Sequence, residues 1–66
     1  MSDKFFEITT IIIESLPYIK VVNNELIVPY ILYNELKNYK NKQDYDIIIE
    51  DFRLKYNLKK NYIIRT

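Results

Sequence analysis

The sequence contains no glycine, and this absence decides where the chain can turn. Positive φ angles are costly for most residues other than glycine, and asparagine tolerates them best among the remainder. Turns that need a positive φ must therefore fall on asparagine. This reasoning predicts turns at the asparagines that separate the apolar segments, namely Asn23, Asn24, Asn41, Asn57 and Asn61.

The length of 66 residues predicts a single domain, residues 1–66, with a small core. A chain of this size buries only about 60% of the surface that it exposes when unfolded. Small scaffolds often add a disulfide, a metal or a partner. The sequence has neither Cys nor His, which excludes disulfides, zinc fingers, iron–sulfur clusters and haem ligation. We therefore expect association with a protein partner or with a second copy.

The composition predicts a folded, soluble, intracellular protein of the cytoplasm or nucleus. Apolar residues make up 48% of the chain, which argues against disorder. No apolar run approaches the roughly 18 residues of a membrane span, and the N-terminus does not resemble a signal peptide. Ile, Asn, Lys and Tyr dominate while Ala is absent, which indicates an A+T-rich genome.

The chain up to Leu16 is expected to form a first helix that Ser2 or Asp3 caps. Pro17 ends this helix because it disfavours helical geometry at the preceding residue. Apolar residues recur at helical spacing, at Phe5, Ile8, Ile12 and Leu16. The run from 11 to 13 is entirely Ile, which predicts a central helix that is covered around most of its circumference.

The segment YIKVVNNELIVP allows two interpretations. Asn23 and Asn24 can occupy both positive-φ positions of a type I′ turn and close a β-hairpin. The alternative is one short strand followed by a loop. Pro29 then suits the first turn of a second helix. The inward stripe of this helix is Leu32, Leu36 and Tyr39, whereas Asn34, Lys37 and Asn38 face water.

The strongest helical periodicity lies in DYDIIIEDFRLKYN, residues 44–57. Asp44 is expected to cap this third helix, and Asn57 to end it in a left-handed conformation. Its core face is Tyr45, Ile48, Ile49, Phe52 and Tyr56. NYIIRT predicts a closing strand. The fold class is therefore α+β, with three helices, a short β-hairpin or strand after the first helix, and a closing C-terminal strand.

This order resembles a winged-helix domain, in which the second and third helices form a helix-turn-helix flanked by strands. The stretch from Ile11 to Arg65 is similar to the C-terminal winged helix of cullins in its Asn-Glu-Leu entry, its Ile-rich third helix and its Tyr-Ile-Ile-Arg strand. Cullins carry a modified lysine late in the first helix, whereas this chain has Glu14, Ser15 and Leu16 there. The resemblance therefore implies the fold and not ubiquitin-ligase function. A full two-stranded wing is missing unless the segment around Asn23 substitutes for it.

The residue types predict that the protein is not an enzyme. Ser2 and Ser15 have no His to activate them, and no glycine-rich loop is available to hold phosphates. The acidic residues of the third helix, Asp44, Asp46, Glu50 and Asp51, are explained by the helix dipole more simply than by a metal. The chain is also short for a pocket of several hundred Å³. We expect no cofactor, metal or small-molecule substrate.

Basic residues define an alternative function, nucleic-acid binding. They are Lys37, Lys40, Lys42, Lys55, Lys59, Lys60 and Arg65, with Tyr39, Tyr56 and Tyr62 among them. Lysines contact phosphates and tyrosines stack on bases. Against this function stands a pI of 7.9, where nucleic-acid-binding domains usually exceed about 9. The acidic start of the third helix would also repel a phosphate backbone.

A second apolar line on the third helix favours a protein-interaction module that docks on a larger assembly or self-associates. Ile47 and Leu54 lie within about 20° of each other around the helix, and Leu58 is expected to continue the line. A helix that is apolar on two faces is either sandwiched or presents one face to a partner. Phe6 and Ile13 give the first helix a similar excess. The predicted partner-binding residues are Ile47, Glu50, Leu54 and Leu58, with Tyr30 and Tyr33 as further anchors.

Overall fold

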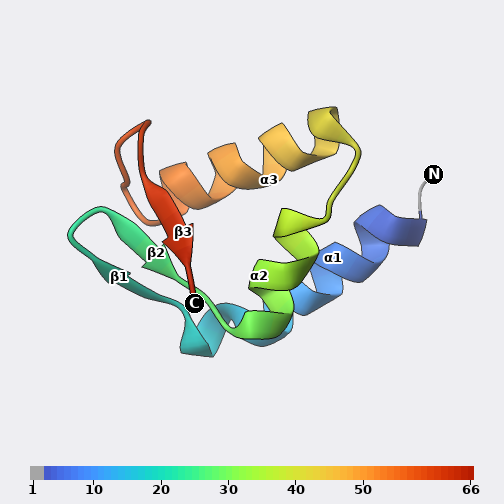
Figure 1. Ribbon diagram of the computed structural model, residues 1–66, viewed down its shortest axis with the longest axis horizontal. Helices are drawn as coiled ribbons and strands as arrows, with labels where there is room; N and C mark the ends of the chain where they lie inside the picture. The colour runs from blue at the N-terminus through green and yellow to red at the C-terminus, as the bar shows by residue number, and fades with distance from the viewer. Residues whose placement is uncertain (1–2) are drawn as a thin grey trace.

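The computed structural model describes residues 3–66, and over this range it has three α-helices, a short 3₁₀ helix and a three-stranded sheet (Figure 1). The elements in chain order are α1 (Asp3–Ser15), η1 (Leu16–Tyr18), β1 (Lys20–Val22), β2 (Glu25–Ile27), α2 (Tyr30–Lys37), α3 (Lys42–Lys55) and β3 (Ile63–Arg65). The predicted α+β class is confirmed. The closing strand is also confirmed.

Helix α1 ends where the sequence predicts, but it is not the central element of the fold. Its α-helical part stops at Ser15, and the chain continues as the 3₁₀ helix that contains Pro17. Of its described side chains, only Ile8 and Ser15 are buried, whereas Phe6 and Ile13 are largely exposed. The prediction of a widely covered helix is therefore wrong, because α1 packs at the margin of a small fold. The capping proposed for Ser2 or Asp3 lies outside the described side chains.

Asparagine closes the hairpin between β1 and β2, which decides between the two interpretations of this segment. Val22 pairs with Glu25 across a two-residue turn, and Asn23 and Asn24 have φ angles of 48° and 63°. Both angles lie in the left-handed region that a type I′ turn requires. β2 also pairs with β3, in parallel, so the sheet order is β1-β2-β3.

Helix α3 begins and ends at asparagines. The side chain of Asn41 accepts a hydrogen bond from the backbone N–H of Asp44 (3.2 Å), so Asn41 is the N-cap. The prediction that Asp44 caps the helix is wrong, because the helix already starts at Lys42. At the other end Asn57 has a φ of 55°, as predicted for a left-handed cap.

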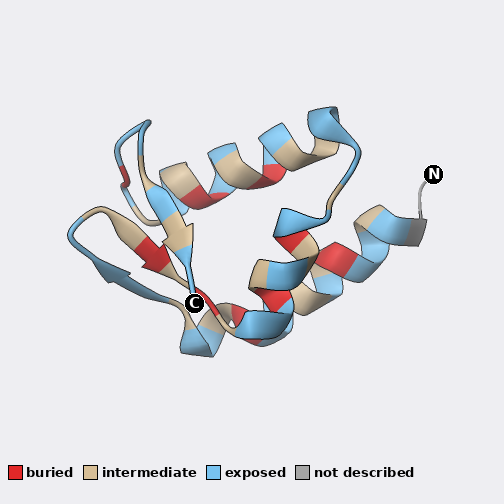
Figure 2. Cartoon of the chain, viewed as in Figure 1, coloured by how far each residue is buried: buried red, intermediate tan, exposed pale blue. Residues whose placement is uncertain are grey.

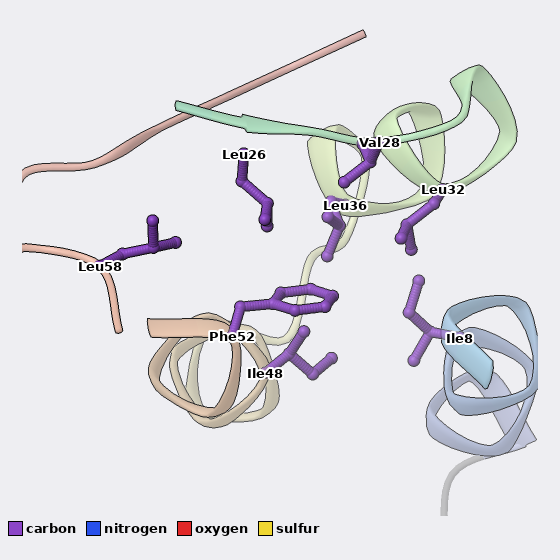
Figure 3. Packing of buried hydrophobic residues seen from close by; sticks show 8 residues of the cluster. All are labelled: Ile8, Leu26, Val28, Leu32, Leu36, Ile48, Phe52 and Leu58. Atoms are coloured by element: carbon purple, nitrogen blue, oxygen red, sulfur yellow. The ribbon is translucent and has the colours of Figure 1, made fainter. Parts of the chain in front are cut away.

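The core lies where α1, α2, α3 and β2 meet (Figures 2 and 3). Figure 3 shows the Phe52 ring of α3 pointing into the space between Leu26 and Ile8. The buried cluster consists of Ile8, Leu26, Val28, Leu32, Leu36, Ile48, Phe52 and Leu58. Tyr45 and Tyr56 are partly buried against this cluster, as the periodicity of the third helix predicts, and Ile49 is half-buried. Tyr39, predicted for the inward stripe of the second helix, is also partly buried but lies beyond the end of α2.

Candidate functional site

An apolar groove of about 540 Å³ runs between α1 and α3. One wall is formed by Phe5, Thr9, Ile12 and Ile13 of α1 and by Leu16 of η1. The α3 wall is formed by Ile47, Ile48, Phe52 and Leu54, with Glu50, Asp51 and Lys55 along its rim. Ile48 and Phe52 belong to the core, so the floor of the groove is continuous with the protein interior.

Ile47 and Leu54 are exposed on this wall, as their positions in the sequence predict. Ile47 is 55% exposed and Leu54 65%, and no strand among residues 3–66 covers them. The same groove brings Ile13 of α1 opposite this line of α3, with 62% exposure. Large apolar side chains gathered in this way mark interaction surfaces more often than isolated ones do.

The rim between Ile47 and Leu54 carries two carboxylates. Glu50 accepts hydrogen bonds from the guanidinium of Arg53, at 2.9 Å from Nε, and this contact lowers the pKa of the Glu50 carboxyl. Asp51 is exposed and has no ion pair within 4.0 Å in the described chain. The middle of this wall therefore offers an unpaired negative charge beside two apolar side chains.

Leu58 does not continue the exposed line of α3. Its exposure is 6%, and its side chain belongs to the core (Figure 3). The prediction is wrong because helical geometry ends at Lys55, and the left-handed residue Asn57 turns the chain inward. The helical wheel that joins Ile47 to Leu54 therefore does not extend to Leu58.

The two tyrosines predicted as partner anchors lie apart from the groove. Tyr30, at the start of α2, is 67% exposed but does not line the groove. Tyr33 lines a different hollow together with Tyr45 and Tyr62. Of the predicted partner-binding residues, the groove thus brings together Ile47, Glu50 and Leu54 only.

The basic residues predicted to contact nucleic acid are likewise spread over separate parts of the surface. Lys37, Lys40 and Lys42 line one hollow, and Lys60 lies across an adjoining one. The other three basic residues lie elsewhere: Lys55 is on the groove rim, the backbone N–H of Lys59 donates to Asn24 Oδ1, and Arg65 pairs with Glu25 in the sheet. The seven residues therefore do not form one basic surface.

The adjoining hollows hold a tyrosine cluster that the sequence only hinted at. Tyr33, Tyr45 and Tyr62 come from α2, α3 and the segment before β3, and they line a hollow of about 300 Å³. The Tyr62 hydroxyl donates to the carbonyl oxygen of Ile49 (2.9 Å). Burial raises the pKa of Tyr62 to about 12. The interleaving of tyrosine with lysine was visible in the sequence, but the meeting of three distant tyrosines depends on the tertiary fold.

Within residues 3–66 no three carboxylates gather closely enough to hold a metal ion. The helices there are too short or too polar to cross a membrane.

Comparison of the chain with protein families, with curated proteins and with solved structures yields no match.

Proposed function

We propose that this protein is a non-enzymatic protein-interaction module whose α1–α3 groove binds an amphipathic helix of another protein. The observation that carries this proposal is the row of exposed apolar residues, Ile47 and Leu54 on α3 and Ile13 on α1, around a groove of about 540 Å³. Amphipathic helices bind in such grooves through apolar residues at i, i+3 or i+4, and i+7. Ile47 and Leu54 are about 10.5 Å apart along α3, which matches two turns of a partner helix.

Asp51, which lies between Ile47 and Leu54 and has no ion pair among residues 3–66, favours a basic partner over a second copy of this chain. In a two-fold dimer the same surface meets itself. Antiparallel pairing that sets Ile47 against Leu54 of the copy would also set Glu50 against the Asp51 of the copy. Like charges facing each other disfavour that complex. A partner helix with Lys or Arg beside its middle apolar residue would pair with Asp51 instead.

The winged-helix assignment is part of this proposal. The order of a strand, α2, α3 and a closing strand supports it, with the β1–β2 hairpin in place of a wing. In such a fold α3 would be the recognition helix. Its exposed surface carries Ile47, Leu54 and carboxylates, which suits a protein partner better than a phosphate backbone.

Nuclear magnetic resonance of the isotope-labelled protein provides the test. The probe is a synthetic amphipathic helix of about four turns with Leu at positions i, i+4 and i+7 and Lys beside them. We expect its addition to shift the signals of the groove walls on α1 and α3. A second peptide with Glu in place of Lys should bind at least several-fold more weakly. Shifts confined to other surfaces, or equal affinity for both peptides, would overturn the proposal.

A native partner can be tested with matched variants. Ile47→Asp with Leu54→Lys should abolish co-purification of the partner from the source cells. Ile31→Asp with Ile63→Lys introduces the same two charges at exposed apolar residues outside the groove. This control variant should still co-purify with the partner. Light scattering of the wild type should report a monomer. If the wild type is a dimer and only the groove variant dissociates it, the groove binds a second copy of this chain and not a partner helix, which would overturn the proposal.

A further inference from the structure

A trough lined by tyrosine and lysine lies on the side of α3 that faces away from the groove. Tyr45 and Ile49 line it, and on the helix they lie about 160° from Ile47 and Leu54. Two hollows, of about 300 and 390 Å³, share Leu36, Lys37 and Tyr45 and so form one trough. This site is separate from the groove, because neither hollow shares a lining residue with the groove. Helix α3 contributes different residues to each.

Three half-buried tyrosines give the trough its aromatic wall. Tyr62 is anchored, since its hydroxyl donates to the carbonyl oxygen of Ile49 at 2.9 Å. The ammonium of Lys37 lies 5.9 Å from the centroid of the Tyr33 ring, a cation–π contact that holds this lysine beside the hollow. Tyr45 belongs to both hollows. Anchored rings that keep part of their surface open can stack on a flat ligand without a large loss of side-chain entropy.

Lysines make the trough locally positive although the chain as a whole carries only +1. Lys37 and Lys60 line the first hollow, and Lys40 and Lys42 line the second, where Lys42 is paired with Asp46 (3.4 Å) and Lys40 carries the charge. No lining residue of either hollow is acidic. The carboxylates nearby are engaged: Asp44 accepts from the Tyr39 hydroxyl, Asp46 pairs with Lys42, and Glu50 pairs with Arg53 while also lying near Lys60.

We propose that this trough binds single-stranded nucleic acid, with one base against the tyrosines and the flanking phosphates on Lys37, Lys40 and Lys60. Proteins that bind single strands combine a basic groove with aromatic rings on which bases stack. A base inside a duplex is already stacked and paired, so it cannot reach rings recessed between α2, α3 and β3. The lysines of the second hollow continue beyond the tyrosine pocket, which suits a strand better than a mononucleotide.

Fluorescence measurements at low ionic strength test this site. The chain contains no Trp, so its intrinsic emission comes from tyrosine. We expect a labelled single strand of about 12 nucleotides to bind and to quench that emission. With three lysines on phosphates, the logarithm of affinity should fall with the logarithm of salt concentration with a slope of about −2. A duplex of equal length, a mononucleotide and inorganic polyphosphate should each bind at least about ten-fold more weakly.

Two charge variants with the same net charge localise the binding. Lys37→Glu with Lys60→Glu should lower the affinity for the single strand at least about ten-fold. Lys20→Glu with Lys55→Glu, outside the trough, should change this affinity by less than about two-fold. Circular dichroism checks that each variant folds. Chemical-shift mapping on the wild type provides the same localisation if a variant does not fold, with shifts expected at Tyr33, Tyr45 and Tyr62.

Several outcomes would overturn the proposal. They are the absence of strand binding at low salt, equal losses in the two charge variants, and shifts outside the trough. The proposal also fails if polyphosphate binds as tightly as the strand, or if strand binding leaves tyrosine emission unchanged. Either result would mean that the lysines attract phosphate without any stacking of a base on the tyrosines. A duplex or a mononucleotide that binds as well as the strand would contradict the assignment to a single strand.

Discussion

The backbone N–H of Leu58 donates to the carbonyl oxygen of Arg53 (2.9 Å), across the left-handed residue Asn57. The N–H of Asn57 reaches the carbonyl of Leu54 (3.4 Å), and the two bonds together form a Schellman motif. The motif reverses the chain at the end of α3 and delivers the Leu58 side chain to the core. One backbone angle therefore connects the end of the helix to the packing of the fold.

Replacing Asn57 should reveal the cost of that angle. A left-handed residue with a Cβ costs about 1–2 kcal/mol, less for Asn than for Val. Asn57→Val should therefore lower the free energy of unfolding by about 1 kcal/mol, a loss of about 4–8 °C in Tm for a domain of this size. Asn57→Gly should keep the wild-type Tm or raise it. Thermal melts followed by circular dichroism measure both, and equal Tm values for the Val and Gly variants would contradict this role.

The elements of the fold follow local rules and were predictable. Helix periodicity identified the core face of α3. The absence of glycine identified Asn23, Asn24 and Asn57 as left-handed residues, but the same prediction is wrong for Asn41, whose φ is −79°, and for Asn61, whose φ is not positive. The parallel pairing of β2 with β3 was not predictable, because it joins segments far apart in the chain through backbone hydrogen bonds that leave no pattern in either segment.

Only the α3 wall of the candidate site could be predicted from the sequence. Periodicity placed Ile47 and Leu54 on one line, since both lie within a regular helix, and the structure shows that this line is exposed. The prediction is wrong at Leu58, because this residue lies beyond the end of α3 and helical spacing no longer applies there. The opposite wall on α1 could not be assigned, because the crossing of two helices depends on tertiary packing. The same holds for the meeting of Tyr33 with Tyr62.

Asn24 should behave differently from Asn57 when it is replaced by glycine. Its side chain accepts a hydrogen bond from the backbone N–H of Lys59 (2.9 Å) and donates to Asn61 Oδ1 (3.4 Å). Asn24→Gly relieves the positive φ but removes both bonds, each worth about 0.5–1.5 kcal/mol. We expect a net loss of about 1 kcal/mol in urea unfolding. Asn23→Gly relieves the same kind of strain without these bonds and should be neutral or stabilising, so the reverse order would contradict the bridging role of Asn24.

Two apolar residues of α3 should differ sharply in their contribution to stability. Phe52 is 2% exposed and lies in the centre of the core, so Phe52→Ala should cost about 3–5 kcal/mol and unfold much of the protein at room temperature. Leu54→Ala removes an exposed side chain and should change stability by less than about 0.5 kcal/mol. Urea unfolding followed by circular dichroism compares the two. A large loss with Leu54→Ala would mean that Leu54 stabilises the fold instead of presenting a surface.

Tyr62 should make the protein sensitive to alkali. Burial raises its pKa to about 12 in the folded state, against an ordinary value of about 10. The folded state therefore holds this proton more tightly than the unfolded state, and the resulting stability is complete below about pH 10. It is lost as the pH rises from about 10 through about 12, because the unfolded state releases this proton while the folded state still holds it. Tyr62→Phe abolishes this contribution together with the hydrogen bond to Ile49.

The expected result is a difference in unfolding free energy between the wild type and Tyr62→Phe that depends on pH. At neutral pH the variant should be less stable by about 1 kcal/mol, the value of the lost hydrogen bond. Between about pH 10 and 12 the wild type loses stability faster, since only its unfolded state releases the proton of Tyr62 in that window. The two unfolding curves should therefore approach each other. Urea titrations at a series of pH values provide the measurement, and a difference that stays constant up to pH 12 would show that Tyr62 does not titrate as its burial requires.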